Sequence, residues 1–286
     1  MVISVLSGKG GTGKTTVVAA LSEIAKAKIK VDCDVDAPNL YLFYKGTDSK
    51  TKSFYGSKKA EVDHRLCIEC GSCEEVCRFE AIEKGKINPY NCEGCGACLL
   101  VCPQEAISLT DEKTATTCMT TTDKGLLSRA KMEIGSDGSG KLVTQVRKNA
   151  EPFVKEEDLV ILDGSPGIGC SVIASLTDID IALIITEPTR SGLEDLKRIV
   201  ELTEHFETKG MVCINKYDIN PDMTKEIEEF AKRKNLVVVG EIPFDSFVME
   251  SINSLQPITS FEKSPAKKAI EKMWERIDAL NIRNKA

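Results

Sequence analysis

Short apolar runs alternate with amphipathic segments along most of the 286-residue chain. Runs rich in aliphatic and β-branched residues predict strands over residues 2–6, 29–35, 159–162, 179–186, 211–214 and 237–239. Apolar residues at helical spacing predict helices over residues 15–26, 193–206, 222–234 and 265–280. Because strands alternate with helices, we expect right-handed βαβ units and an α/β fold with a doubly wound, mainly parallel sheet.

This alternation stops between about residues 50 and 155. Two polar stretches, residues 46–59 and 110–125, show no clear periodicity and are interpreted as loops. Between them, residues 67–82 resemble residues 92–107, which indicates an internal repeat. We therefore predict a small α+β domain at residues 53–112, inserted into a larger domain formed by residues 1–52 and 113–286.

Composition narrows the class of protein. Hydrophobic residues make up 42% and charged residues 29% of the chain, as in ordinary globular proteins. No apolar run reaches the ~18 residues of a membrane-spanning helix, and the chain begins without a basic, cleavable signal, so we expect a cytoplasmic protein. The net charge of −6 and the 5% aromatic content argue against nucleic-acid binding. The last predicted helix mixes acidic and basic residues, so we expect it to pack on the sheet without stable membrane association.

A glycine-rich loop carries the first candidate chemistry. Residues 8–15 match the pattern G-x-x-x-x-G-K-[ST], between a predicted strand and a predicted helix. The loop amides would cradle phosphate oxygens, Lys14 would reach the β and γ phosphates, and Thr15 would bind Mg²⁺. The expected nucleotide-binding residues of the loop are Gly8, Gly10, Gly11, Thr12, Gly13, Lys14, Thr15 and Thr16. A second near-match at residues 135–142 ends in leucine, lacks a predicted strand before it, and is interpreted as a loop.

Acidic residues follow two of the predicted strands. Asp32, Asp34 and Asp36 lie at the end of the second strand, and Asp163 ends a later apolar strand, as expected of a Walker B aspartate. Because the carboxyl ends of parallel strands lie at one edge of a sheet, these side chains can converge on the loop at residues 8–15. Asp163, or any one of the three earlier aspartates, can instead be a solvated residue at the end of a strand.

The stretch KGGTGKTT, with an additional lysine near its start, resembles the deviant Walker A motif of the MinD/ParA superfamily, which includes the nitrogenase iron protein and the Mrp-type cluster carriers. The resemblance implies a Mg²⁺-dependent ATPase in which two subunits enclose two nucleotides, so that Lys9 reaches the partner's phosphates. It further implies that Lys9, Lys14 and Asp34 are catalytic, with Asp34 positioning the attacking water. Charge supplied across an interface in this way would act like an arginine finger.

The same resemblance implies the remaining ligands of ATP and Mg²⁺. Thr15, Asp32 and Asp163 would surround Mg²⁺, and Asn215 and Pro243 would line the adenine pocket. The resemblance gives no role to Asp36. The sequence INKYD at residues 214–218 also resembles the guanine-reading NKxD motif of GTPases, but the early lysine favours ATP.

Eight of the twelve cysteines lie between residues 67 and 102. They form two C-x₂-C-x₂-C-x₃-C runs with the spacing of bacterial ferredoxins, in which the fourth cysteine of each run binds the other run's cluster. The spacing predicts one [4Fe–4S] cluster on Cys67, Cys70, Cys73 and Cys102, and a second on Cys92, Cys95, Cys98 and Cys77. A zinc site and a disulfide cage are the alternatives; zinc usually takes two separated cysteine pairs. The first run departs from the pattern because it is followed by arginine, whereas Pro103 follows the second.

The other four cysteines carry weaker signals. Cys33 and Cys213 lie in or beside predicted strands, where buried structural cysteines are expected. Cys118 falls in a predicted polar loop. Cys170 follows Asp163 by seven residues, the spacing of one cluster ligand in the nitrogenase iron protein, so a redox or metal-binding role for it stays open.

The resemblance implies a homodimeric, Mg²⁺-dependent ATP-hydrolysing switch, and the cysteine spacing adds an iron–sulfur electron-transfer module. Hydrolysis would be slow or activated by a partner, and the redox partner protein is unknown. Two alternatives are a carrier that delivers Fe–S clusters or a metal centre to an acceptor protein, and a positioning ATPase like ParA or MinD.

Overall fold

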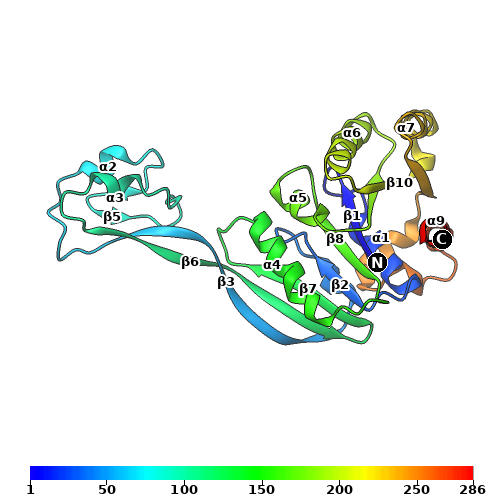
Figure 1. Cartoon of the computed structure of the whole chain (residues 1–286), viewed down its shortest axis with the longest axis horizontal. Coiled ribbons are helices and arrows are strands. Elements are labelled where there is room, and N and C mark those ends of the chain that lie inside the picture. Colours follow the sequence, from blue (N-terminus) through cyan, green and yellow to red (C-terminus); the bar gives the residue numbers. More distant parts are fainter. Residues whose placement is uncertain (286) are drawn as a thin grey trace. The chain divides into compact units, whose positions relative to one another are not determined.

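The computed structural model describes the backbone of residues 1–285 and the burial of residues 1–280. The chain forms two compact units, both drawn in Figure 1. The first unit comprises Met1–Thr51, Thr117–Lys131 and the described chain from Gly138 onward. The second comprises Lys52–Thr116 and Met132–Asp137. Its bounds lie close to the predicted residues 53–112, but it also includes a short segment that lies far outside that range.

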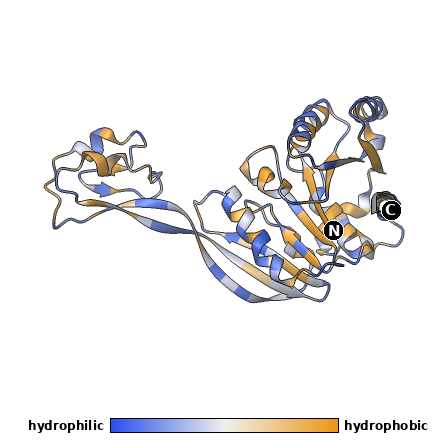
Figure 2. Cartoon of the chain, in the orientation of Figure 1, coloured by the Kyte–Doolittle hydropathy of each residue, from blue (hydrophilic) through white to orange (hydrophobic). Residues whose placement is uncertain are grey.

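A nine-stranded sheet contains most of the described strands. Their order is β11 (Val237–Ile242), β10 (Lys209–Asn215), β9 (Ile181–Thr186), β1 (Val2–Ser7), β8 (Val160–Pro166), β2 (Ile29–Asp32), β7 (Gly125–Met132), β6 (Ile107–Thr122) and β3 (Gly46–Val62). From β11 to β7 every neighbouring pair is parallel. Figure 2 shows how hydrophobic residues fill the central strands, which fits strands that are buried on both faces.

Helices cover both faces of the parallel strands. On one face, α1 (Lys14–Ile24) and α9 (Pro265–Lys285) pack against strand residues such as Val5 and Leu183. On the other, α5 (Cys170–Leu176), α6 (Arg190–His205) and α7 (Pro221–Arg233) pack against the alternating residues, among them Leu6 and Ile184. The remaining helical elements of the first unit are α4 (Gly140–Ala150), α8 (Ser246–Ser254), η1 (Leu40–Phe43), η2 (Glu151–Phe153), η3 (Tyr217–Ile219) and η4 (Ile258–Ser260).

The doubly wound, mainly parallel sheet predicted from the sequence is confirmed. The expectation that the last helix packs on the sheet is confirmed as well, because Ile270, Met273 and Ile277 of α9 are buried in the core. No helix among the described residues combines the length and apolar character needed to cross a membrane.

The two stretches interpreted as loops are strands, so that interpretation was wrong. Residues 46–59 belong to β3 and residues 110–125 lie mostly in β6. The first eight residues of β3 are exposed, and no apolar alternation marks them in the sequence. Figure 2 shows that the long strands β3 and β6 are mostly hydrophilic. Strand β7 and helix α4 were not predicted from the sequence either.

The second unit repeats one structural motif twice. Helices α2 (Ser72–Val76) and α3 (Ala97–Val101) each begin after a glycine with a positive φ angle, 80° at both Gly71 and Gly96. After the last cysteine of each run, the amides of Ala81 and Ala106 donate to the sulfurs of Cys77 and Cys102. The short antiparallel pair β4 (Ile82–Glu83) and β5 (Lys86–Ile87) completes this unit, so the sequence repeat is also a structural repeat.

Candidate functional site

The glycine-rich loop joins the end of β1 to the start of α1. Gly11 and Gly13 have φ angles of 82° and 84°, which side-chain-bearing residues rarely adopt. A Cβ atom at Gly8 would lie 2.1 Å from the Cβ of Asp195, so α6 leaves no room for a side chain there. The loop from Gly10 to Thr16 lines a cavity of about 630 Å³, called here the loop cavity.

Lys14 forms the electrostatic centre of the loop cavity. Its ammonium donates to the carboxylate of Asp163 and lies 3.8 Å from Asp34 Oδ2. Burial lowers the pKa of Lys14, but the carboxylates of Asp163 and Asp34 more than offset it, so the pKa is raised above its ordinary value. Lys14 is therefore charged and positioned where a phosphate would meet it.

The aspartates around Lys14 differ in their surroundings. Asp32 is fully buried and accepts hydrogen bonds from the amides of Asp34 and Leu40, both at 3.2 Å. Burial, together with the charge of Asp163, raises the pKa of Asp32 well above its usual value. Burial also raises the pKa of Asp34, which lines the loop cavity. The two oxygens of Asp32 thus hold the turn after β2, whereas Asp34 and Asp36 both face the cavity.

The residues present fit a bound Mg²⁺. The Oδ2 atom of Asp163 is buried and has no hydrogen-bond partner among the described residues, and Thr15 lines the loop cavity. Mg²⁺ takes oxygen ligands and is usually held by one or two carboxylates plus substrate phosphates. Within the described part of the chain, no three His, Cys, Asp or Glu side chains are arranged to hold a metal ion by themselves. Such a cage is not required for an ion that also binds phosphates.

A second cavity of about 300 Å³ adjoins the loop cavity and contains both residues predicted for the adenine pocket, Asn215 and Pro243. The two cavities share Gly11, Gly13 and Thr16 of the loop. Asn215 Nδ2 donates to the carbonyl of Thr12 at 2.8 Å, which fixes the amide against the loop. The joined cavities can therefore accept an elongated ligand that has phosphates at one end.

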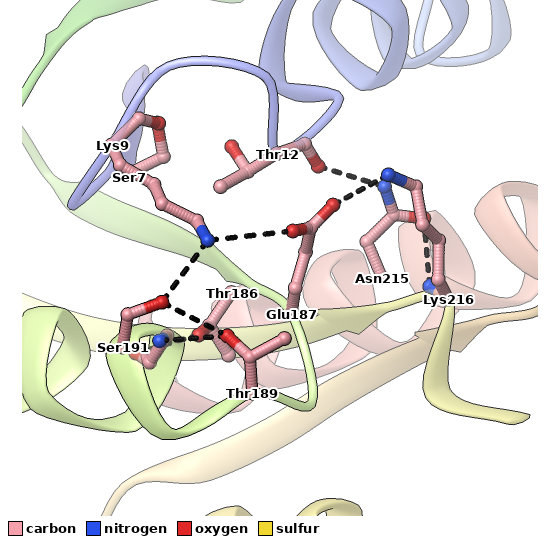
Figure 3. A network of polar contacts seen from close by, with 10 residues as sticks. Ser7, Lys9, Thr12, Thr186, Glu187, Thr189, Ser191, Asn215 and Lys216 are labelled. Carbon is pink, nitrogen blue, oxygen red and sulfur yellow. Dashed lines mark hydrogen bonds and ion pairs between the residues drawn. The ribbon is translucent and has the colours of Figure 1, made fainter. Parts of the chain in front are cut away.

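In the sequence INKYD, the charged residues already have partners. Asp218 Oδ1 accepts from the amide of Phe244 at 2.7 Å, and the Lys216 ammonium lies 2.5 Å from Glu187 Oε1. Figure 3 shows Glu187 between Lys216 and Lys9. Because Asp218 and Lys216 already have these partners, they are less available to bind a guanine base than the motif alone suggests.

Lys9 is not one of the described residues that line the loop cavity, although its neighbour Gly10 is. Its ammonium donates to Ser191 Oγ at 3.2 Å and lies 3.9 Å from Glu187 Oε2 (Figure 3). Glu187 was not foreseen as a site residue. It directly follows β9, and the rule that sites form at the carboxyl ends of parallel strands could have identified it.

The eight clustered cysteines surround two cavities in the second unit. Those of one predicted set, Cys67, Cys70, Cys73 and Cys102, line a cavity of about 140 Å³. Those of the other set, Cys77, Cys92, Cys95 and Cys98, line a smaller one. Each cavity thus collects three cysteines of one run and the fourth of the other, and none of these eight described cysteines forms a disulfide.

The donor set in these cavities fits iron–sulfur clusters. Backbone amides donate to three of the sulfurs, from Ala60 to Cys92 at 3.4 Å, Ala81 to Cys77 at 3.4 Å and Ala106 to Cys102 at 3.3 Å. Such bonds stabilise thiolate sulfur and tune cluster potentials. A zinc site usually takes two separated cysteine pairs, whereas each cavity here takes three cysteines from one run and one from the other.

The four other cysteines are distributed differently. Cys33 and Cys213 are fully buried, as predicted, and burial raises the pKa of both thiols to about 12. The prediction that Cys118 lies in a polar loop was wrong, because it is buried in β6. Cys170 is exposed at the start of α5. It lies close to the start of α4, because a Cβ atom added to Gly140 would be 3.3 Å from the Cβ of Cys170.

The second near-match to the phosphate-binding pattern, at residues 135–142, does follow a strand, β7, contrary to expectation. Its amides are already engaged. Gly138 donates to Asp36 Oδ1 at 2.7 Å, and Ser139 caps α4 by accepting from the amide of Leu142. Asp36 itself lines the loop cavity, where the sequence allowed the acidic residues after this strand to converge.

Comparison with solved structures supports this fold. The chain superposes on the crystal structure of the cell division ATPase MinD from Pyrococcus furiosus with a TM-score of 0.60. The two sequences are 20% identical, and the superposition covers 98% of each chain. At this identity the likeness shows the shared architecture alone.

Sequence relatives extend the comparison. The uncharacterized protein MJ0578 of Methanocaldococcus jannaschii is 36% identical over 224 residues, which cover 77% of this chain and 79% of that protein. The iron-sulfur cluster carrier protein of Pyrococcus horikoshii is 28% identical over 152 residues, covering 48% of this chain and 52% of that protein. The CobQ/CobB/MinD/ParA nucleotide binding domain matches residues 3–258, and the chain therefore belongs to this family of nucleotide-binding proteins.

Proposed function

We propose that the protein is a homodimeric, Mg²⁺-dependent ATPase whose nucleotide cycle controls electron transfer through two [4Fe–4S] clusters. One observation carries the proposal. A single chain combines a lysine-centred phosphate loop with two cavities that are each lined by four cysteines. The phosphate loop is not needed to stabilise the first unit, because that unit has an extensive apolar core of its own.

The chain's own residues supply the chemistry of hydrolysis. Lys14 would neutralise charge on the transferred phosphoryl group, and Thr15 with Asp163 would hold Mg²⁺. Asp34 faces the cavity and would orient the attacking water. Asp32 is better suited to support the turn that carries Asp34, because both its oxygens bind backbone amides.

The position of Lys9 supports a role in a dimer. Its ammonium contacts Glu187 and Ser191 and so lies outside the loop cavity of its own subunit. A cation placed there is available to a second subunit that packs against this edge. A cation that a partner subunit supplies, like the arginine finger of GTPases, increases the rate constant of phosphoryl transfer by roughly 10³ to 10⁵.

The cysteine cavities would hold the redox groups. A bound [4Fe–4S] cluster supplies one-electron chemistry. The protein would contribute eight thiolates, amide donors to Cys77, Cys92 and Cys102, and partial exclusion of water, since Cys92 and Cys98 are buried. Cys70 and Cys95 are exposed, which leaves each cavity accessible to a redox partner protein.

Spectroscopy of anaerobically purified protein tests the proposal. We expect about eight iron atoms per chain, and an EPR spectrum or midpoint potential that shifts with a non-hydrolysable ATP analogue but not with ADP. The shift should disappear in Lys9→Ala if it depends on the dimer. A potential that is independent of nucleotide would refute the coupling, and absence of iron after reconstitution would refute the clusters.

The iron-sulfur cluster carrier relatives favour a second candidate, delivery of clusters to an acceptor protein. The exposed sulfurs of Cys70 and Cys95 would permit attack by acceptor thiols. Mixing the loaded protein with an apo-ferredoxin and separating the two distinguishes the functions. Rapid, ATP-dependent loss of iron from this chain would support delivery, whereas retention of all iron would support electron transfer.

A further inference from the structure

Asp36 and the segment from Glu133 to Gly138 form a path that joins the two kinds of site. The path is made of contacts inside each unit and of the peptide chain that connects them. At one end, Asp36 lines the loop cavity, two residues after Asp34. The family resemblance assigns no role to this exposed carboxylate.

The contact at the nucleotide end is specific. Gly138 donates its amide hydrogen to Asp36 Oδ1 at 2.7 Å, a charge-assisted hydrogen bond. A Cβ atom at Gly138 would lie 2.4 Å from the same oxygen, so the carboxylate occupies the space that any side chain would fill. Only glycine allows Asp36 this close approach.

The other end of the segment is fixed within the cysteine-bearing unit. Glu133 donates its amide to the carbonyl of Thr114 at 2.9 Å, and its carboxylate lies 2.6 Å from the Lys113 ammonium. Gly135 packs beneath the ring of Tyr90, because a Cβ there would lie 3.4 Å from the ring. Tyr90 precedes the cluster-two ligand Cys92 by two residues.

We propose that Asp36 is a positioning residue that transmits the state of the loop cavity to the cysteine-bearing unit by holding residues 133–138. A triphosphate in the loop cavity places several negative charges near the Asp36 carboxylate, and like charges at short range repel. A shift of Asp36 changes its bond to Gly138, from which only two residues lead to Gly135 beneath Tyr90. This inference rests on the proposed coupling between nucleotide and clusters, and it names the residues that carry it.

The chain offers well-matched variants. Asp36→Ala removes the acceptor, whereas Asp36→Asn keeps an oxygen that can accept the same bond. Gly138→Ala displaces the carboxylate from the other side, and it is compatible with folding because the clash involves only the end of a flexible side chain. Asp137→Ala is the control, since Asp137 is exposed in the same segment and its side chain has no hydrogen bond or ion pair within the described residues.

Hydrogen–deuterium exchange of the full-length protein provides the first test. Without nucleotide, loss of the Asp36 contact should speed exchange of the amide of residue 138 about tenfold in Asp36→Ala, with no change in Asp137→Ala. With Mg²⁺ and a non-hydrolysable ATP analogue, the wild type and Asp36→Asn should show altered exchange at residues 132–139. Asp36→Ala and Gly138→Ala should lose that response but keep protection of residues 8–16. A wild-type response in Asp36→Ala, or none in the wild type despite protection of residues 8–16, would overturn the inference.

EPR of the loaded protein separates this inference from the proposed function. A nucleotide-dependent shift that persists in Asp36→Ala would leave the proposed function standing and refute the role of Asp36. An exchange response at residues 132–139 that depends on Asp36, without any EPR shift, would support the path and refute the electron-transfer coupling.

Discussion

The buried ion pair between Lys14 and Asp163 makes a quantitative prediction about stability. Lys14 is 5% exposed and Asp163 is fully buried, and the equally buried Asp32 lies in the same group of charges. Lys14→Ala would leave the buried Asp163 and the partly buried Asp34 without the ammonium that pairs with both. Breaking a buried pair from one side costs about 3–5 kcal/mol, so we expect a loss of this size in the free energy of unfolding.

Urea unfolding measured by tryptophan fluorescence can detect this loss in the first unit alone. The chain has a single tryptophan, Trp274 in α9, which packs against the core beneath the sheet. Lys234→Ala is the matched control, because its ion pair with Glu204 is largely exposed. Its removal should cost no more than about 1 kcal/mol.

The pH dependence provides a further check on the same variant. Burial raises the pKa of Asp32, so the folded protein binds this proton at a higher pH than the unfolded chain does. Stability therefore increases as pH falls through the folded pKa, and the deficit of Lys14→Ala should shrink in acid. Millimolar Mg²⁺ should also restore part of the loss, because no described residue makes a hydrogen bond to Asp163 Oδ2. A variant that unfolds within about 1 kcal/mol of the wild type at neutral pH would refute this reasoning.

Three other substitutions test separate features. Burial lowers the pKa of Lys30 from 10.5 to about 8, so the unfolded chain binds more protons between these values and stability rises with pH by about 3 kcal/mol. Lys30→Met should remove that rise from urea-unfolding data, and an unchanged profile would contradict it. Lys9→Ala should lower kcat for ATP by about 10³ while the Kd changes less than about twofold, because Lys9 contacts Glu187 and not the loop cavity; an increase in Kd alone would argue against a role in trans. Cys98→Ser should lose about half of the bound iron whereas the exposed Cys170→Ser keeps it, and equal iron contents would disprove the ligand assignment.

The parallel sheet was predictable because its strands are buried on both faces. Residues 181–186, for example, are buried without exception, and this leaves an uninterrupted apolar run in the sequence. Strand β3 has the opposite character, since its first eight residues are all exposed. Its strand conformation depends on pairing with β6, more than fifty residues away, and such pairing leaves no local hydrophobic pattern.

In the candidate sites, too, the role of a single residue is predictable only where the local sequence determines its position. The spacing of Cys67 to Cys102 predicted which four cysteines share each cavity, because local turns fix the position of three of them. In the segment VDCDVD, by contrast, the spacing does not indicate which of the three aspartates faces a ligand. In the structure Asp32 is fully buried, Asp34 is partly buried and Asp36 is exposed.

These differences arise from neighbours that are remote in sequence. Asp32 is buried because β8 pairs with β2 and places Asp163 opposite it. Asp36 lies beyond the strand, where the turn before α4 brings the Gly138 amide to its carboxylate. The same side chain can therefore support a turn, face the nucleotide or hold a connecting segment, and the choice follows from which strand or turn lies next to it. For that reason the function of the third aspartate became a testable question only once its contact with a glycine 102 residues away was known.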